Sequence, residues 1–183
     1  MALSSHEVLL LAVNSVVAAS LVHAGLSKLA VPGPLRQALA ELRVPAPATT
    51  VTAVRAYAVA ECLAGLALLA DPTRAAGGVL VAIVGLAVAA LGVLGTVRGS
   101  VTPCGCFGNR DSRPLGLTNV AIGLGFAVAG ALSLAGGAAG LTPGAPVGAP
   151  ALLGGAGAML LLCLYVSRGW ARPLIRPRRG TSL

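Results

Sequence analysis

Long apolar runs constrain this chain more than any other feature. Five of them approach the roughly 20 residues with which a helix crosses about 30 Å of hydrocarbon. They lie at about 8–30, 51–70, 75–97, 116–134 and 147–167. Lipid leaves only helices or closed barrels able to satisfy every backbone polar group. We therefore predict an all-α fold, a polytopic transmembrane helix bundle of about four core helices plus a fifth C-terminal helix.

The composition agrees with this prediction. Hydrophobic residues make up 56% of the 183 residues and charged residues 10%, whereas about a quarter of a soluble domain is charged. The 25 glycines favour close helix packing in lipid. Residues 1–183 are expected to form a single integral membrane domain, because no repeat and no soluble segment interrupts the pattern. The first run is expected to remain as a helix, since no basic stretch typical of a cleaved signal peptide precedes it.

The distribution of basic residues predicts an orientation. The chain has a formal net charge of +8, and its basic residues gather after the first run, in the loop 98–115 and in the tail 168–183. The positive-inside rule then places a multi-pass protein in the cell membrane, with its N-terminus outside and its C-terminus and the loop 98–115 in the cytoplasm. No basic-aromatic module accompanies the charge, so we expect the lipid bilayer, and no nucleic acid, as its partner.

The loop 98–115 contains the most reactive pair of side chains, Cys104 and Cys106. A disulfide across one intervening residue closes a small ring, for which Gly105 supplies backbone freedom. Strained disulfides are readily reduced, which favours a redox relay over a structural crosslink. Two alternatives stay open: a soft chelate for Cu(I) or zinc, or two reduced thiols in a turn. The cytoplasmic placement conflicts with the oxidising compartment in which disulfides usually persist.

The other two cysteines lie in apolar runs. Cys62 falls in the middle of the second run and Cys163 near the end of the fifth. Each is either a small buried hydrophobic residue or a membrane-embedded thiol that exchanges with the loop pair.

Glu61 is the costliest residue in the apolar runs, because a carboxylate inside a membrane must be paired or protonated. We expect its partner to be His23 in the first run or Tyr57 one turn away. A His23–Glu61 pair would either relay protons for thiol–disulfide exchange or form a structural hydrogen bond. Lys28 is expected to extend toward the membrane surface from the end of its helix.

Three segments resemble known membrane proteins. The stretch from His23 to Leu29, HAGLSKL, is similar to the G-x-x-K-L signature of DoxX-like and MauE-like proteins. Glu61 with Gly65 and the leucines that follow resembles their E-x-x-x-G-x-x-L stretch. The segment 104–108, CGCFG, resembles the C-x-C-F-G box of the methylamine utilisation protein MauE family.

The resemblance implies a polytopic, redox-associated membrane protein. The family acts in the maturation of methylamine dehydrogenase, whose small subunit is rich in disulfides, together with the thioredoxin-like protein MauD. By this resemblance Cys104 and Cys106 would be the redox pair, and Lys28 and Glu61 family positions of undefined role. A member can serve another disulfide-bearing client.

We therefore predict a membrane thiol–disulfide redox relay that supports disulfide formation or maturation of a client protein and acts with a thioredoxin-fold partner. The candidate catalytic residues are Cys104, Cys106, Cys62, Cys163, Glu61 and His23. Whether the chain is itself a thiol–disulfide oxidoreductase stays open. The alternatives are a non-catalytic assembly scaffold and a metal-handling or transport protein. No cofactor is expected, because aromatic residues are scarce and no C-x-x-C-H haem motif is present.

Overall fold

The computed structural model describes residues 5–103 and 114–136. Within these ranges every regular element is helical, which confirms the predicted all-α fold. The elements are α1 (Ser5–Ala30), α2 (Gly33–Glu41), a 3-10 turn (Ala46–Thr49), α3 (Val51–Leu69), a second 3-10 turn (Asp71–Thr73), α4 (Arg74–Arg98) and α5 (Leu117–Ala135). The predicted fifth membrane helix, 147–167, and the tail 168–183 lie outside the described residues.

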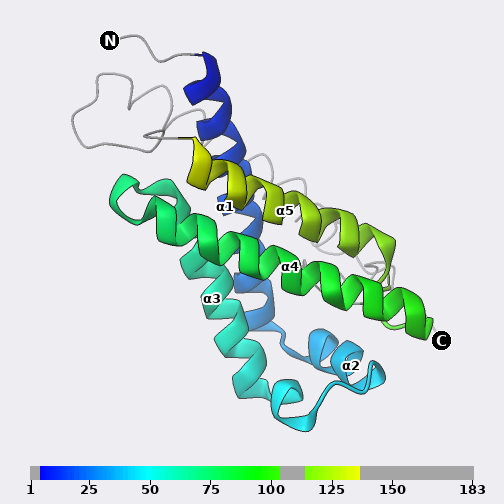
Figure 1. Cartoon of the computed structure of the whole chain (residues 1–183). Helices are drawn as coiled ribbons and strands as arrows, with labels where there is room; N and C mark the ends of the chain where they lie inside the picture. Colours follow the sequence, from blue (N-terminus) through cyan, green and yellow to red (C-terminus); the bar gives the residue numbers. More distant parts are fainter. Residues whose placement is uncertain (1–4, 104–113, 137–183) are drawn as a thin grey trace, which may run out of the picture.

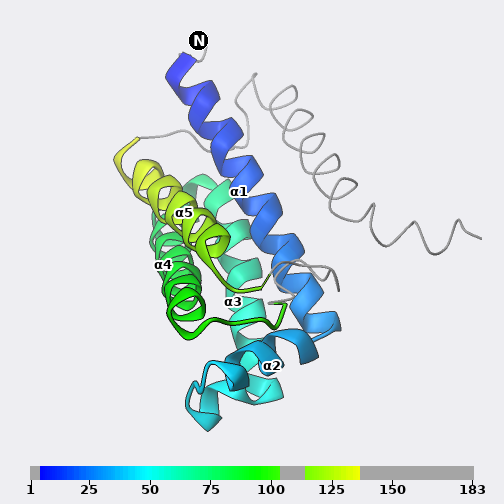
Figure 2. The same cartoon turned by 90° about the vertical axis from the view of Figure 1, so that its right-hand side faces the viewer.

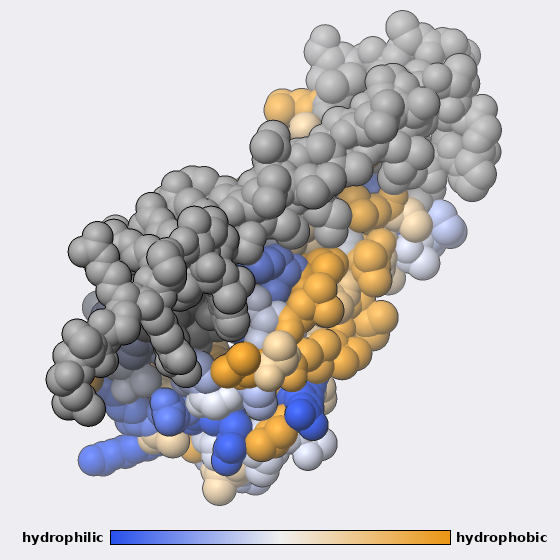
Figure 3. Space-filling view, turned by 180° about the vertical axis from the view of Figure 1, so that it is seen from behind, coloured by the Kyte–Doolittle hydropathy of each residue, from blue (hydrophilic) through white to orange (hydrophobic). Residues whose placement is uncertain are grey.

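Four of the helices, α1, α3, α4 and α5, are long and apolar enough to cross a membrane. Their ends lie within a few residues of the predicted spans. On the face drawn in Figure 3, hydrophobic residues form a broad zone over the helices, and hydrophilic residues gather at the end where α2 lies. These features fit a multi-pass membrane protein.

The short helix α2 was not predicted. The sequence Pro32-Gly33-Pro34 was interpreted only as the end of the first apolar run, but it begins a helix that buries Leu35, Ala38 and Leu39. The prediction was incomplete because proline is tolerated in the first turn of a helix, where its missing N–H would have no partner. A nine-residue helix is also too short to show as an apolar run.

The membrane helices form two pairs. In Figures 1 and 2, α4 and α5 run side by side, and α1 crosses the bundle against α3. The chain passes back and forth, so the ends of α1 and α4 and the starts of α3 and α5 lie toward the end of the bundle that carries α2 (Figure 2). We call this the α2 end.

Small residues allow the close approach of α4 and α5. A Cβ added to Gly85 of α4 would lie 2.5 Å from the carbonyl oxygen of Gly123 in α5, and a Cβ on Gly123 would lie 2.5 Å from that of Gly85. Contact at this distance requires glycine on both helices, as expected where no hydrophobic drive brings helices together in lipid. A hydrogen bond between Asn14 and Ser133, 2.5 Å from Oγ to Oδ1, joins α1 to α5.

Candidate functional site

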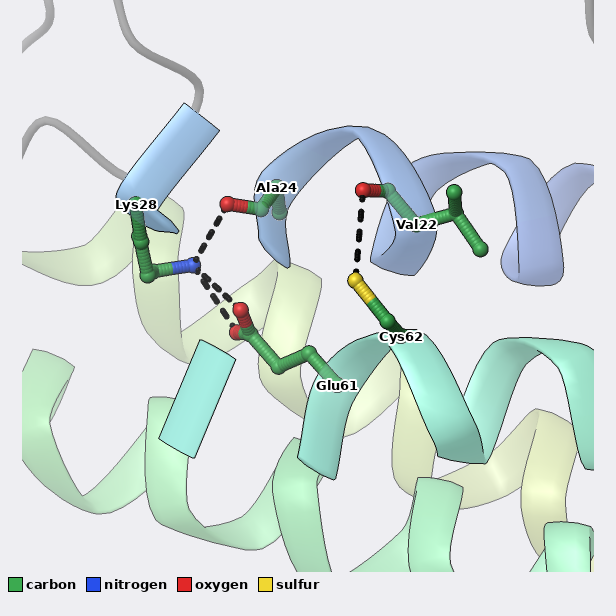
Figure 4. A network of polar contacts seen from close by, with 5 residues as sticks. All are labelled: Val22, Ala24, Lys28, Glu61 and Cys62. Carbon is green, nitrogen blue, oxygen red and sulfur yellow. Dashed lines mark hydrogen bonds and ion pairs between the residues drawn. The ribbon is translucent and has the colours of Figure 1, made fainter. Parts of the chain in front are cut away.

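A buried ion pair joins α1 to α3. Lys28 Nζ lies 2.7 Å from Oε2 and 2.9 Å from Oε1 of Glu61, so both carboxylate oxygens are engaged. The two side chains are 3% and 2% exposed. Figure 4 shows them pointing toward one another across the two helices, with Lys28 also directed at the carbonyl oxygen of Ala24, 3.5 Å away. The ammonium group lies 5.6 Å from the ring centre of Tyr57.

The pair corrects two predictions. Glu61 is paired with Lys28 rather than with His23, and Lys28 is buried rather than extended toward the membrane surface. The reason is the rotation of α1. A Cβ on Gly25 would lie 2.6 Å from the Ala58 carbonyl oxygen, so this side of α1 faces α3. His23 is two residues earlier, about 200° around a helix of 3.6 residues per turn.

His23 is therefore separated from the ion pair. Its Nε2 is buried and has no hydrogen-bond partner among the described residues. Tyr57, the other predicted partner, does lie beside Lys28 and Glu61. The prediction of a buried, paired carboxylate at Glu61 was right, and its choice of His23 was wrong.

Cys62 follows Glu61 on α3 but points elsewhere. Its sulfhydryl is directed at the carbonyl oxygen of Val22, 3.8 Å away, and it is a half-buried free thiol (Figure 4). The sulfur packs at the glycine contact between α1 and α3, where a Cβ on Gly25 would lie 2.5 Å from it. A role for Cys62 in thiol exchange stays a prediction.

A cavity of about 30 Å³ lies beside the ion pair. It is lined by residues of all five α-helices and by Leu115, two residues before α5. Its polar lining comes from Lys28, Glu61, Tyr57 and Asn119. The rest of its wall is apolar and comprises Leu21, Ala24, Leu35, Val88, Leu91, Leu115, Ile122 and Phe126. The ion pair thus lies at the wall of an internal space, with α2 covering it through Leu35.

The segment that leads into the cysteine loop is fixed to α2. The Glu41 carboxylate accepts hydrogen bonds from the Val101 amide at 3.0 Å, and from the Thr102 amide and the Ser100 hydroxyl at 3.2 Å each. The Arg98 guanidinium donates to the carbonyl oxygen of Leu42 just beyond α2. Hydrogen bonds from the Thr102 side chain and the Val101 backbone lower the pKa of Glu41, so it is charged at neutral pH.

The two flanks of the cysteine loop also meet. Pro103 and Pro114 form an isolated antiparallel bridge, so the chain leaves and re-enters the bundle at one place. Leu115, which follows Pro114, is buried at the start of α5 and lines the cavity. Cys104 follows Pro103 directly in the sequence.

Glu41 and Asn119 were missed by sequence reasoning. Glu41 would have been found if Pro32-Gly33-Pro34 had been interpreted as a helix start, because the carboxylate then ends a short amphipathic helix beside the loop. Asn119 lies three residues into α5, and its Oδ1 accepts from the Gly116 amide at 3.3 Å. A polar residue near the start of a helix is typical of a cap, so nothing in the sequence pattern indicated the cavity.

The remaining predicted site residues, Cys104, Cys106 and Cys163, lie outside the described residues. A redox role for the three cysteines stays a prediction. Among the described residues, no group of three His, Cys, Asp or Glu side chains is placed to hold a metal ion.

One comparison identifies a family. A model of the family described as methylamine utilisation protein MauE matches residues 6–136, from the start of α1 to the end of α5. The matched segment includes Lys28, Glu61 and the Cys104–Cys106 pair. No curated protein and no solved structure matches the chain. Because the match covers well over half of the 183 residues, the chain belongs to the methylamine utilisation protein MauE family.

Proposed function

We propose that this protein is a membrane thiol–disulfide relay that supports disulfide formation in a client protein, as part of the role in methylamine utilisation that its family name carries. The cysteine pair Cys104–Cys106 would exchange with the client and with a thioredoxin-fold partner. The observation that carries the proposal is the anchoring of the loop that contains the pair, since both of its flanks are held at the α2 end.

Anchoring suits a relay because thiol–disulfide exchange requires the attacking, central and leaving sulfur atoms to lie in one line. Glu41 fixes the three residues before Pro103, and the bridge between Pro103 and Pro114 closes the loop at its base. Catalytic groups that are held on a rigid scaffold react faster than groups that must be ordered at each turnover. A loop serving only as a connection between α4 and α5 would not require a buried or charged partner on α2.

The reaction proceeds by two exchanges. A client thiolate attacks the Cys104–Cys106 disulfide, forming a mixed disulfide and releasing one loop cysteine as a thiolate. The second client thiolate then attacks the mixed disulfide and releases the other loop cysteine. The client loses two electrons and gains a disulfide, while the loop pair becomes a dithiol. The same two exchanges with the disulfide of a thioredoxin-fold partner restore the loop disulfide.

The charge distribution supports a cytoplasmic position for the α2 end. Arg36, Arg43 and Arg98 lie there, whereas Asp71 and Arg74 between α3 and α4 offset one another. By the positive-inside rule the more basic end faces the cytoplasm. The N-terminus would then lie outside.

The test uses the full-length protein in lipid nanodiscs, equilibrated in mixtures of reduced and oxidised glutathione, whose potential suits a readily reduced disulfide, and then alkylated with a maleimide mass tag. We expect a reversible two-electron transition that disappears in Cys104→Ser/Cys106→Ser, with no change in unfolding temperature. Each single variant should retain one thiol that traps a mixed disulfide with a thioredoxin-fold protein.

Two results would count against the relay, and a third against its orientation alone. Thiols that stay reduced at every ratio of oxidised to reduced glutathione would favour the scaffold. Metal that copurifies and is lost in the double serine variant would favour metal handling. Labelling of the loop thiols in intact cells by an impermeant reagent would reverse the proposed orientation but leave the relay.

A further inference from the structure

The buried ion pair and the cavity beside it are not explained by the exchange chemistry alone. We propose that the cavity holds water and that the Lys28–Glu61 pair, acting through this water, is the proton-exchange site of the relay. This inference rests on the proposed function, because it assigns the site to thiol–disulfide exchange at Cys104 and Cys106.

The cavity has room for water, and one part of its mostly apolar wall carries polar groups that can bind it. Its volume of about 30 Å³ has room for at least one water molecule. Empty cavities in proteins are apolar, whereas buried water makes two to four hydrogen bonds with polar groups. Lys28, Glu61, Tyr57 and Asn119 supply such groups from three different helices.

Burial makes the pair an expensive way to hold α1 against α3. Taking two charges out of water costs several kcal/mol per ion, so a buried pair is weak evidence for a stabilising role. Glycine contacts already hold the two helices together at Gly25 and Gly65, where an added Cβ would lie 2.6 Å and 2.9 Å from backbone oxygens of the other helix. Ionisable residues inside a membrane are in general functional.

The cavity lies next to the base of the cysteine loop. Leu115 forms part of its wall and is bonded to Pro114, which bridges to Pro103, the residue before Cys104. Leu115 is held in place by α4, since a Cβ on Gly95 would lie 2.6 Å from both its Cβ and its carbonyl oxygen. Leu115 therefore links the cavity wall to the Pro103–Pro114 bridge at the loop base.

Thiol–disulfide exchange needs a proton to move but consumes none. The attacking thiol must lose a proton to become a thiolate, and the sulfur that leaves the broken S–S bond takes its electron pair and then gains a proton. Glu61 accepts the first proton through the cavity water and returns it to the departing thiolate. Return of the proton leaves Glu61 as a carboxylate beside Lys28, so the site ends each exchange as it began.

Among the described residues, the titratable groups around this site are Lys28, Glu61 and Tyr57 at the cavity and the free thiol of Cys62, the residue after Glu61. Lys28 faces the cavity from α1, and Glu61 and Tyr57 face it from α3. The cavity linings from α2, α4 and α5 carry no ionisable side chain; they contribute Leu35, Val88, Leu91, Asn119, Ile122 and Phe126. The pH dependence of exchange should therefore change when the Lys28–Glu61 pair is removed.

The deciding experiment measures how fast dithiothreitol reduces the loop disulfide in the full-length protein, as a function of pH, by stopped-flow in nanodiscs. Lys28→Met/Glu61→Leu removes both charges together, a change that is often neutral or stabilising for a buried pair. We expect the rate to fall by about 100-fold or more, the range of general acid–base catalysis, with unchanged unfolding temperature and redox equilibrium. Asn14→Leu/Ser133→Ala, which removes a buried polar contact outside the cavity, should keep the wild-type rate.

A second variant tests the water without touching the ion pair. Ala24 is buried and lines the cavity, so Ala24→Val should fill part of it and slow exchange while Lys28 and Glu61 remain. Unchanged rates and pH profiles in both variants would overturn the inference and leave the pair a structural lock, with the relay intact. If the wild-type loop forms no disulfide in any mixture of oxidised and reduced glutathione, the proposed function fails and this inference fails with it.

Discussion

The α4–α5 and α1–α3 interfaces use the same packing device but differ in what they bury. Both rely on glycines at which an added Cβ would collide with the backbone of the facing helix, as at Gly85 and Gly25. The α4–α5 contact is formed by small and apolar residues, whereas α1–α3 also encloses the Lys28–Glu61 pair. Close packing therefore does not require the ion pair. The α4–α5 contact therefore serves to hold the bundle together, whereas the α1–α3 contact also carries ionisable groups that could take part in a reaction.

The largest effect is expected from breaking the α4–α5 contact. Gly85→Leu places a side chain where a Cβ alone would lie 2.5 Å from the Gly123 carbonyl oxygen, so the helices must separate along their length. We expect no folded protein to be recovered, measured by size-exclusion chromatography in detergent.

Gly125→Leu is the control, because Gly125 lies in α5, the other helix of this interface, and a Cβ on it meets no atom within 4 Å. It should fold as wild type does. Equal recovery of the two variants would show that close approach of α4 and α5 is not what holds the bundle.

A smaller but still large effect is expected from breaking one half of the ion pair. Lys28→Met leaves the Glu61 carboxylate buried without its counter-charge, which costs about 3–5 kcal/mol in comparable buried pairs. Lys28→Met/Glu61→Leu should recover most of this loss, as measured by denaturant unfolding in mixed micelles. A double variant as unstable as the single one would mean that the pair, like the glycines, holds the helices together.

The smallest effect is expected at the α2 end, outside both interfaces. The pKa of Glu41 is lowered in the folded protein, so its contact with Val101 and Thr102 is fully present at neutral pH and is lost as pH falls through that lowered pKa. Limited proteolysis between α4 and α5 should accelerate a few-fold over this acidic range. Glu41→Gln should cleave faster already at neutral pH and lose the acid dependence.

The exposed neighbour Gln37 provides the control for this experiment. Gln37→Ala should retain the wild-type pH dependence of cleavage. The same acid dependence in Glu41→Gln would assign it to another group.

The membrane helices could be predicted because a helix that spans a membrane needs a long apolar run. The four membrane helices that the structure describes coincide with such runs in the sequence. The carboxylate at Glu61 was also predictable as a buried and paired group. Its partner was not, because the rotation of α1 is set by its glycine contact with α3 rather than by hydropathy. Lys28 near a helix end has the same pattern as a surface lysine.

The α2 end was the region that could not be predicted from the sequence. A nine-residue helix gives too short a pattern, and the contacts of Glu41 join residues about 60 positions apart in the chain. Neither periodicity nor spacing reports such a contact. The cavity could not be predicted for the same reason, because the residues that line it belong to five helices that come together only in the folded bundle.

The position of the ion pair in the chain also bears on biosynthesis. Lys28 and Glu61 belong to the first two membrane spans, so both are made before α4 and α5. A charge at the centre of a span costs about 2.5–3.5 kcal/mol to insert; Glu61 lies near the centre of α3, whereas Lys28 lies in the last turn of α1. If α1 and α3 leave the translocon as a hairpin, the two charges neutralise one another on entry. Lys28 and Glu61, whose insertion is energetically the most unfavourable, would then enter the membrane together, before α4 and α5 are made.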